Sequence, residues 1–345
     1  MTSRKKRVAV VIVLLTVQCG IMIYTLTRHN RHVSVKETND NIRVHYSIDP
    51  PKNYSERCMN STAVCTETPK DISQSEGIWT GLKDDLSAYS SITNRSKHLD
   101  IHCDVCAVVS SSGQLLGSKA GTEIDNATCV IRMNIAPTKG FEVDVGTRTS
   151  VRIAGFLGMT RGIFKSTKFF ENERFPGKVV IWTNKNGNLV KEESLELIKH
   201  HAGLDMYMTS DEHVEFCEAL FQKETGRNRE KSKSWLSTGW FTMIFALKVC
   251  DKVKVYGMID FDHCSRNKTR SKDVPYHYYD KTEVKECDVS NAGETRSTGG
   301  HRYLTEKYVF RKWAKSADME FFYPSWNITS ELHKLPIFLN SAASK

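Results

Sequence analysis

Short apolar runs that alternate with helical patterns constrain the fold of this chain more than any other feature. The strand-like runs are Ala107–Val109, Cys129–Arg132, Val179–Trp182, Met206–Met208, Val253–Tyr256 and Glu320–Tyr323. Helical patterns separate several of them, at Glu192–His200, Val214–Gln222, Phe241–Val249 and Thr305–Lys315. Such alternation is typical of an α/β domain whose largely parallel sheet is flanked by helices.

Two blocks place small residues where ligands bind in such a sheet, at the carboxyl ends of strands. In the first block, Cys106–Arg152, the small residues Ser110–Gly113 follow a strand and allow close backbone approach. In the second, Trp235–Gly257, Ser237, Thr238 and Gly239 precede an amphipathic run, where a helix N-terminus favours an anion. The blocks predict an anion site, with a mere chain turn at Ser110–Ser112 as the alternative.

Motifs and charge disfavour several classes of function. No G-x-G-x-x-G follows the first strand and no Walker loop is present, which disfavours a dinucleotide dehydrogenase and a P-loop ATPase. The formal net charge is +9, but the basic residues are dispersed after an N-terminal cluster. We therefore expect no nucleic-acid partner, and the excess charge suits acidic ligands.

The N-terminus contains an apolar run, Val8–Leu26, preceded by the basic cluster Arg4–Arg7. Its length is close to the roughly 20 residues that cross a bilayer. A cleaved signal peptide is the alternative, but it would have a shorter apolar core and a small-x-small cleavage site, which is not evident. We expect a type II topology with a cytosolic tail at 1–7, an anchor at 8–26 and the remainder lumenal.

The rest of the chain divides into a stem, a folded domain and a tail. Residues 27–97 are polar and lack periodicity, as expected for a flexible stem, whereas 98–330 hold the strand and helix patterns and 331–345 form a tail. Six glycosylation sequons lie on the proposed lumenal side, at Asn53, Asn60, Asn94, Asn126, Asn267 and Asn327. Ten cysteines agree with an oxidising compartment, and nine lie after the anchor, so at least one is unpaired or intermolecular.

Four motifs in order carry a resemblance to a known family. The two blocks resemble the large and small sialyl motifs of the animal sialyltransferases, which use CMP-sialic acid as donor. Tyr276–Asp280 resembles the third motif, and His301 with Glu306 resembles the very small motif, His-x4-Glu. The spellings SSSG, RMN-APTKG, LSTGWFT and VPYHYYD are similar to the GalNAc alpha-2,6-sialyltransferase branch. The resemblance covers roughly Cys103 to Trp326.

The resemblance implies both a fold and an activity. The fold would be a Rossmann-like, GT-A-like sialyltransferase variant in the Golgi membrane. The reaction would transfer sialic acid from CMP-sialic acid in alpha-2,6 linkage to GalNAc of sialyl-alpha-2,3-Gal-beta-1,3-GalNAc on O-glycans or gangliosides. The alternatives are a sialyltransferase of another linkage and a catalytically silent glycan-binding membrane protein.

The resemblance also implies roles for individual residues. His301 would be the base that deprotonates the acceptor hydroxyl in an inverting displacement, since histidine titrates near neutrality. His277 would lie near the donor phosphate. Glu306 would either hold the base or cap and pack a helix, and Tyr278 and Tyr279 would support the site as candidates for ligand contact.

Donor-binding positions follow from the same motifs. The pattern carries over to Asn134, Ser237, Thr238 and Gly239, and also to Ser111 and Gln114. At the last two positions the wider family has the asparagines of GNSGN, so the chain departs from the family pattern there. Serine and glutamine side chains still donate and accept hydrogen bonds.

Disulfide pairings are expected as well. The resemblance implies a bridge from Cys106 to Cys250, with Cys103 paired to Cys58 or Cys65. We infer a further bridge from Cys264 to Cys287, which flank the third motif. The CxxC at Cys103–Cys106 is weak evidence for zinc or a redox dithiol.

A metal is not expected at the site. Asp260 and Asp262 spell the Asp-x-Asp with which many other glycosyltransferases hold a divalent ion. A CMP donor has a single phosphate, and the resemblance implies catalysis without metal or cofactor. We expect Asp260–Asp262 to form an exposed loop instead.

Overall fold

The computed structural model describes residues 85–329 except 166–168, 170–176, 184–186, 202, 230–232, 267–272 and 282. The expected membrane anchor, most of the expected stem and the tail at 331–345 lie outside the described residues. Among the helices that are described, none combines the length and the apolar character that a bilayer crossing requires.

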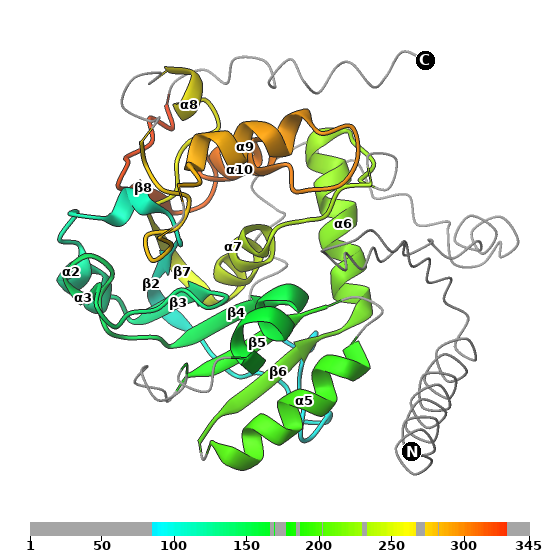
Figure 1. Ribbon diagram of the computed structural model, residues 1–345. Helices are drawn as coiled ribbons and strands as arrows, with labels where there is room; N and C mark the ends of the chain where they lie inside the picture. The colour runs from blue at the N-terminus through cyan, green and yellow to red at the C-terminus, as the bar shows by residue number, and fades with distance from the viewer. Residues whose placement is uncertain are drawn as a thin grey trace, which may run out of the picture. The chain divides into compact units, whose positions relative to one another are not determined.

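A single eight-stranded sheet organises the described part of the chain, with strand order β1-β6-β5-β4-β3-β2-β7-β8 (Figure 1). The strands are β1 (Tyr89–Ser91), β2 (Cys103–Val109), β3 (Cys129–Met133), β4 (Val151–Gly155), β5 (Lys178–Trp182), β6 (Asp205–Thr209), β7 (Cys250–Tyr256) and β8 (Met319–Phe322). All neighbours pair in parallel except β1, which runs antiparallel to β6. The expectation of an α/β fold with a largely parallel sheet is confirmed.

The strand order reverses direction beside β2. From β2 the chain adds β3, β4, β5 and β6 on one side, and then β7 and β8 on the other. The loops that leave the carboxyl ends of β2 and β7 therefore diverge at this point, which is where open α/β sheets bind ligands. The two sialyl-motif blocks contribute β2 and β7, so the topology brings them together.

Helices cover both faces of the sheet because successive strand residues point to opposite sides. Val108 and Val180 pack in one core with residues of α6 (Asp211–Thr225), α7 (Thr238–Val249) and α10 (Tyr303–Trp313). On the other face, Val109 packs with residues of α2 (Gly121–Asp125) and α3 (Glu142–Val145), and Val179 packs with α5 (Gly187–His200). Figure 1 shows α5 and α7 on different sides of the strands.

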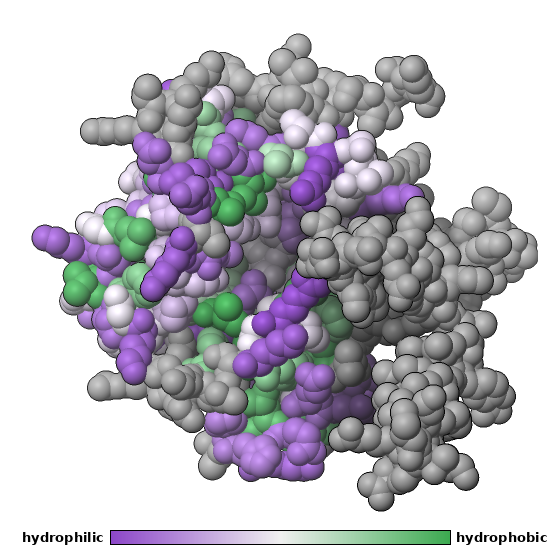
Figure 2. All heavy atoms as spheres, in the orientation of Figure 1, coloured by the Kyte–Doolittle hydropathy of each residue, from purple (hydrophilic) through white to green (hydrophobic). Residues whose placement is uncertain are grey.

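Two further helices follow β7 in the chain, α8 (His263–Arg266) and α9 (Glu286–Thr295). The remaining described elements are 3-10 turns at Gly113–Leu115 and Ile163–Lys165 and a π-helical turn at Gly158–Gly162. The large apolar side chains that are exposed among the described residues are Leu116, Val143, Leu157, Trp235, Val284 and Tyr323. On the face shown in Figure 2, apolar and hydrophilic residues are interspersed.

The folded region begins earlier than the sequence predicts. Residues 85–97, which were assigned to the stem, include β1, and Tyr89 is buried in the main core. Ser90 pairs with Met208 on the outer edge of β6. The stem boundary at residue 97 is therefore too late, because a three-residue edge strand of polar composition carries no apolar run.

Candidate active site

The carboxyl ends of β2 and β7 are joined directly. Ser110 donates its backbone N–H to the carbonyl of Tyr256 at 3.0 Å. Gly257, the first residue after β7, has a φ of +79°, and a Cβ at this position would lie 2.7 Å from Ser110 Oγ. Glycine is thus required on both conformational and steric grounds, at the point where the two motif loops begin.

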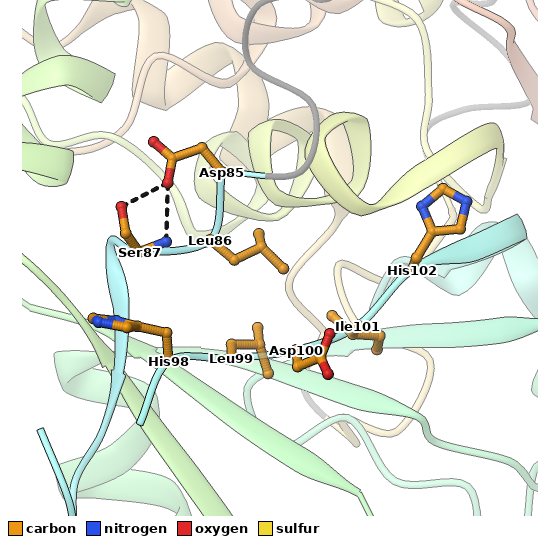
Figure 3. Close-up of a pocket in the computed structure, with 8 residues that line it drawn as sticks. All are labelled: Asp85, Leu86, Ser87, His98, Leu99, Asp100, Ile101 and His102. Atoms are coloured by element: carbon orange, nitrogen blue, oxygen red, sulfur yellow. Dashed lines mark hydrogen bonds between the residues drawn. The ribbon is translucent and has the colours of Figure 1, made fainter. Parts of the chain in front are cut away.

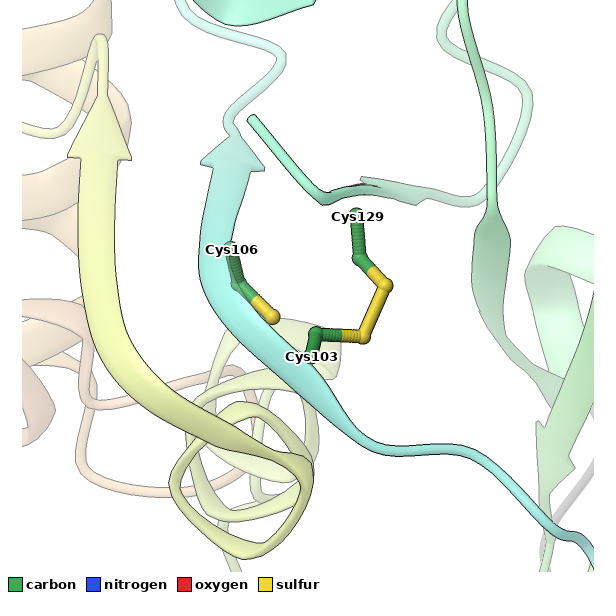
Figure 4. Close-up of side chains that lie close together, drawn as sticks. All are labelled: Cys103, Cys106 and Cys129. Atoms are coloured by element: carbon green, nitrogen blue, oxygen red, sulfur yellow. A yellow bond between two sulfur atoms is a disulfide. The ribbon is translucent and has the colours of Figure 1, made fainter. Parts of the chain in front are cut away.

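The disulfide Cys106–Cys250 joins these two strands, as the resemblance implies, and Cys264–Cys287 confirms the second inferred bridge. The expected pairing of Cys103 with Cys58 or Cys65 is wrong, because Cys103 is bonded to Cys129 (Figure 4). β3 lies beside β2, with Cys129 opposite Cys106, which brings its sulfur within reach of Cys103. Both cysteines of the CxxC are therefore consumed in separate disulfides rather than forming a dithiol.

The loop after β2 is held by the third motif. Gly113 donates its N–H to the carbonyl of Pro275 at 3.1 Å, and Tyr278 donates its N–H to the carbonyl of Ser111 at 2.9 Å. A Cβ on Gly113 would lie 2.5 Å from the Pro275 oxygen, so only glycine allows this approach. Ser111 is half-buried, and its neighbour Ser112 caps the following turn by accepting from the N–H of Gln114.

The small motif forms the N-terminus of α7. Ser237 is the N-cap residue, and its Oγ accepts from the N–H of Trp240 at 3.2 Å. Thr238 and Gly239 form the first turn, whose backbone N–H groups and dipole favour an anion. The helix is buried on nearly all sides, because its residues from Trp240 to Val249 fill the main core.

Asn134 connects the large motif to the small one. Its Nδ2 donates to Thr238 Oγ1 at 3.4 Å, and its Oδ1 accepts from the N–H of Gly155 at 3.2 Å. Its φ of +46° is a left-handed conformation that asparagine tolerates. Arg152, which the sequence did not single out, fixes this loop by donating Nη1 to the Asn134 carbonyl at 2.8 Å.

His301 is held by the chain segment that leads into α7. Its Nδ1 lies 2.8 Å from the carbonyl oxygen of Trp235, and Trp235 N donates to Gly300 O at 3.0 Å. A carbonyl only accepts, so Nδ1 carries the proton and Nε2 of the neutral ring carries a lone pair. Burial lowers the pKa of His301, although the hydrogen bond to Trp235 opposes this shift. The ring is thus favoured in the neutral form that a general base requires.

Glu306 contacts the same segment as His301. Its Oε1 accepts the backbone N–H of Ser237 at 2.8 Å, and its Oε2 pairs with Ser237 Oγ. The side chain is buried, and burial raises its pKa to about 8 while the Ser237 hydrogen bonds oppose the shift. Of the two roles left open for Glu306, these hydrogen bonds support capping. Glu306 ties α10 to the start of α7, and it acts on His301 through the segment that both residues contact.

His277 is oriented by a carboxylate of its own motif. Its Nδ1 lies 2.6 Å from Asp280 Oδ2, and its ring stacks on Tyr279 with centroids 5.0 Å apart. Tyr278 has a different role, because it is buried and its hydroxyl donates to the Pro137 carbonyl at 2.5 Å. Tyr278 therefore supports the loop from within the core rather than facing a ligand.

Two tyrosines link the two histidines. Tyr276 OH donates to Tyr303 OH at 2.9 Å. Tyr276 lies against His277, with ring centroids 4.2 Å apart, and Tyr303 lies 5.2 Å from the His301 ring. The third and very small motifs, which are separated in sequence, therefore meet in one cluster at the carboxyl edge of β2 and β7. Asp280 and Tyr303 lie within the motifs, but the motif sequences alone did not predict that Asp280 contacts His277 or that Tyr303 contacts Tyr276.

The expectation that Asp260–Asp262 form an exposed loop is wrong for Asp260, because this residue is only 2% exposed. Its Oδ2 accepts from Arg311 Nη1 at 2.7 Å and pairs with Arg266 at 3.3 Å, and Asp262 also pairs with Arg266. Burial raises the pKa of Asp260, and the Arg311 guanidinium opposes this shift. The carboxylates anchor α8 and α10 to the end of β7 through arginines.

Other clusters in the described residues lie away from the motifs. A cavity of about 320 Å³ is lined by residues 85–87 and 98–102, which precede β2 (Figure 3). Close by, at the amino ends of β2 and β7, the exposed side chains of His102, Asp104 and Asp251 approach one another. Both features are at the edge of the sheet opposite to the motif loops, and only Asp251 among these residues belongs to one of the two blocks.

Sequence comparison agrees with the site. The family model of glycosyltransferase family 29 (sialyltransferase) matches residues 66–317. A mouse alpha-N-acetyl-neuraminyl-2,3-beta-galactosyl-1,3-N-acetyl-galactosaminide alpha-2,6-sialyltransferase is 41% identical over 70% of this chain and 68% of its own length. The human alpha-N-acetylgalactosaminide alpha-2,6-sialyltransferase 3 is 40% identical over 67% of this chain and 76% of its own length.

The crystal structure of a mammalian sialyltransferase is similar over 64% of this chain and 69% of that chain, with 24% identity and a TM-score of 0.40. The family model spans well over half of the chain, and it includes the motif residues of the cluster around His277 and His301. The chain therefore belongs to glycosyltransferase family 29, the sialyltransferases.

Proposed function

We propose that this sialyltransferase transfers sialic acid from CMP-sialic acid, in alpha-2,6 linkage and with inversion, to the GalNAc of sialyl-alpha-2,3-Gal-beta-1,3-GalNAc. The observation that carries the catalytic assignment is the hydrogen bond from His301 Nδ1 to the carbonyl of Trp235 at 2.8 Å. It leaves Nε2 unprotonated, and burial lowers the ring's pKa, so the base is available near neutral pH.

In the proposed reaction His301 Nε2 takes the proton of the acceptor hydroxyl. The acceptor oxygen forms a bond to the anomeric carbon, and the bond from that carbon to the phosphate oxygen breaks, so CMP leaves with the electron pair. In its imidazolium form His277 donates Nδ1–H to Asp280 and Nε2–H to the leaving phosphate. The free N–H groups at the start of α7 offer further stabilisation of that charge.

The donor would lie between the loop after β2 and the N-terminus of α7. Ser111, Gln114, Asn134, Ser237, Thr238 and Gly239 are the proposed donor contacts. The link from Asn134 Nδ2 to Thr238 Oγ1 supports this, because it brings the two motif halves to one place. Tyr279, stacked on His277, would shield the donor from one side.

Linkage and acceptor are proposed from the relatives. The name of the mouse relative describes alpha-2,6 transfer to a galactosaminide that already carries neuraminyl-2,3-galactose. Because this relative is 41% identical over 70% of this chain, we propose the same acceptor for this protein. The sialylated glycan would be presented on O-glycoproteins or gangliosides.

We further propose that no metal or other cofactor takes part. Asp260 and Asp262 are paired with Arg311 and Arg266, whose guanidinium groups already supply positive charge to these carboxylates. The single phosphate of a CMP donor gives a divalent ion no pyrophosphate to bridge. The arginine pairs support this proposal, which addition of EDTA tests.

The cellular setting follows from the N-terminal pattern. We propose a Golgi membrane protein of type II topology, with Val8–Leu26 as the anchor and the catalytic domain in the lumen. Among the sequons, Asn94, Asn126 and Asn327 are exposed, which suits glycan attachment, and Asn53, Asn60 and Asn267 lie outside the described residues. The disulfides agree with an oxidising compartment.

The test uses the full chain in detergent, because truncation at Lys97 would remove β1. The protein is given CMP-sialic acid and EDTA with sialyl-alpha-2,3-Gal-beta-1,3-GalNAc, or with the same glycan lacking sialic acid, and the product linkage is determined by NMR. We expect an alpha-2,6 product on GalNAc with the sialylated acceptor. No CMP release with either acceptor would refute the enzyme assignment, and an alpha-2,3 or alpha-2,8 product would refute the linkage.

His301→Ala should abolish most turnover in this assay. His200→Ala is the matched control, because His200 is an exposed histidine at the end of α5. Near-normal turnover in the His301→Ala protein would contradict its role as base. Activity that disappears only when EDTA is present would contradict the metal-free mechanism.

A further inference from the structure

The loop Ser110–Gln114, called here the donor loop, is fixed by a buried carboxylate that no motif contains. Glu286, the first residue of α9, is 5% exposed. Its Oε2 accepts from Ser112 Oγ at 2.9 Å and from Gln114 Nε2 at 3.2 Å. One oxygen atom thus binds two side chains of the donor loop.

Backbone contacts place Glu286 at the end of a larger clamp. The segment that begins at Val274 and ends at Glu286 closes on itself, because Glu286 N donates to Val274 O at 3.0 Å. The same segment supplies the Pro275 carbonyl to Gly113 and the Tyr278 N–H to the carbonyl of Ser111. The adjacent Cys287 is bonded to Cys264, which fixes the start of α9.

The contact to Gln114 matters because of how this chain departs from the family. Glutamine has one more rotatable bond than the asparagine of GNSGN, and an unrestrained amide loses that freedom when it binds a ligand. The bond to Glu286 uses one N–H of the Gln114 amide. The second N–H and the carbonyl oxygen keep their hydrogen-bonding capacity, and their direction is set by the fixed amide.

The charge state of Glu286 does not remove this contact. Burial raises the pKa of the Glu286 carboxyl, and the nearby Lys307 ammonium opposes the shift most strongly. An ionised carboxylate accepts at both oxygens, and a protonated one still accepts at the oxygen that lacks the proton. Oε2 can therefore hold Ser112 and Gln114 in either state.

We propose that Glu286 is a positioning residue for donor binding, which holds the Gln114 amide in the orientation that contacts the cytidine monophosphate part of the donor. This inference rests on the proposed function, because it assumes that the donor loop binds CMP-sialic acid. It assigns to α9, which lies outside the four motifs, a role in donor affinity.

A double-mutant cycle on the full chain tests this coupling. The dissociation constant of CMP is measured by isothermal titration calorimetry for the wild type, Glu286→Met, Gln114→Leu and the double variant. Methionine and leucine remove the polar atoms while keeping most of the volume. Each single change should weaken CMP binding roughly tenfold, about the loss of one or two hydrogen bonds. The double variant should be little weaker than either single variant.

Two further variants separate positioning from folding. Glu286→Gln keeps an acceptor for Ser112 and Gln114, so it should bind CMP within about threefold of the wild type. Glu294→Met is the matched control, because Glu294 is also on α9 and 5% exposed, but it accepts from the Leu304 and Thr305 N–H groups. It should lower the melting temperature, and its effect on CMP binding should add to that of Gln114→Leu.

Equal weakening by Glu286→Met in the presence and absence of Gln114 would overturn the proposal. Unchanged CMP affinity in Gln114→Leu would overturn it too, and this variant serves even if Glu286→Met fails to fold, because Gln114 is only half-buried. Failure of the proposed function looks different. In that case the wild type itself would not bind CMP, whereas failure of the positioning role leaves wild-type binding intact.

Discussion

Ser237 donates its backbone N–H to Glu306 Oε1 at 2.8 Å, and the carbonyl two residues earlier, that of Trp235, binds His301 Nδ1. The segment Trp235–Ser237 is therefore fixed from the very small motif at both of its ends. His301 and Glu306 are five positions apart in sequence, but they act on one short segment of the small motif. The base and the N-terminus of α7 are consequently held by the same segment.

The raised pKa of Glu306 predicts how stability depends on pH. The folded protein keeps the proton on Glu306 up to about pH 8, whereas the unfolded chain releases it near 4.5. Between these values the folded state binds more protons, so this group makes the free energy of unfolding fall as pH rises. The slope for one proton is at most about 1.4 kcal/mol per pH unit.

Replacement by glutamine isolates this contribution. Glu306→Gln keeps an acceptor for the Ser237 N–H but has no titratable proton. Denaturant unfolding from pH 5 to pH 8 should therefore show a flatter stability curve for the variant than for the wild type. Parallel curves would mean that Glu306 is ionised throughout this range.

The lowered pKa of His301 makes a second prediction about pH. His301 must be neutral to accept a proton, so activity is lost as pH falls through its pKa in the free enzyme. Because burial lowers that pKa from 6.5, the acid limb of log kcat/KM should have its midpoint below pH 6.5. A midpoint at or above 6.5 would contradict the burial of the base.

Gly113 tests the close contact between the large and third motifs. A Cβ at this position would lie 2.5 Å from the Pro275 carbonyl oxygen, too close without backbone movement. Gly113→Ala should destabilise the protein by about 1–3 kcal/mol and weaken CMP binding. Thermal unfolding and calorimetric titration with CMP measure the two effects.

The matched control for Gly113 is Gly187→Ala at the start of α5. Its added Cβ would meet neighbours no closer than 3.6 Å, an ordinary van der Waals distance. Stability should therefore change by less than about 0.5 kcal/mol. Equal effects of the two alanines would show that the close contact at Gly113 relaxes at no cost.

The sequence predicted the fold class and the meeting of the motifs, because both depend on local patterns. Alternating apolar runs identified most of the parallel strands, and the small residues after β2 and β7 marked the ligand edge. β4 was missed because Arg152 interrupts its apolar pattern. That arginine is fully buried, and its guanidinium donates to the loop carbonyls of Asn134 and Ala136.

Contacts between residues that are far apart in the chain could not be predicted from the sequence, for a physical reason. The pairing of Cys103 with Cys129 depends on which strand lies beside β2, and the sequence gives apolar runs but no strand order. Glu286 was missed on similar grounds, because a single glutamate between two motifs has no pattern. Its contacts to Ser112 and Gln114 span more than 170 positions and appear only in three dimensions.

The disulfide that joins the two motif strands supplies the last prediction. Cys106 and Cys250 are 144 residues apart, and their bond links β2 to β7 beneath the diverging motif loops. Changing both cysteines to alanine frees a long loop in the unfolded chain, so unfolding should become easier by about 2–5 kcal/mol. Cys217→Ala is the control, because Cys217 is buried and is not part of a disulfide. Its removal costs only packing of a small side chain, about 1 kcal/mol.

Denaturant unfolding compares the variants, and a non-reducing peptide map should recover Cys106 with Cys250 and Cys103 with Cys129. Recovery of Cys103 linked to Cys58 or Cys65 would contradict the β2–β3 bridge, and equal stability of the double variant and the wild type would contradict the stabilising role of the β2–β7 bond.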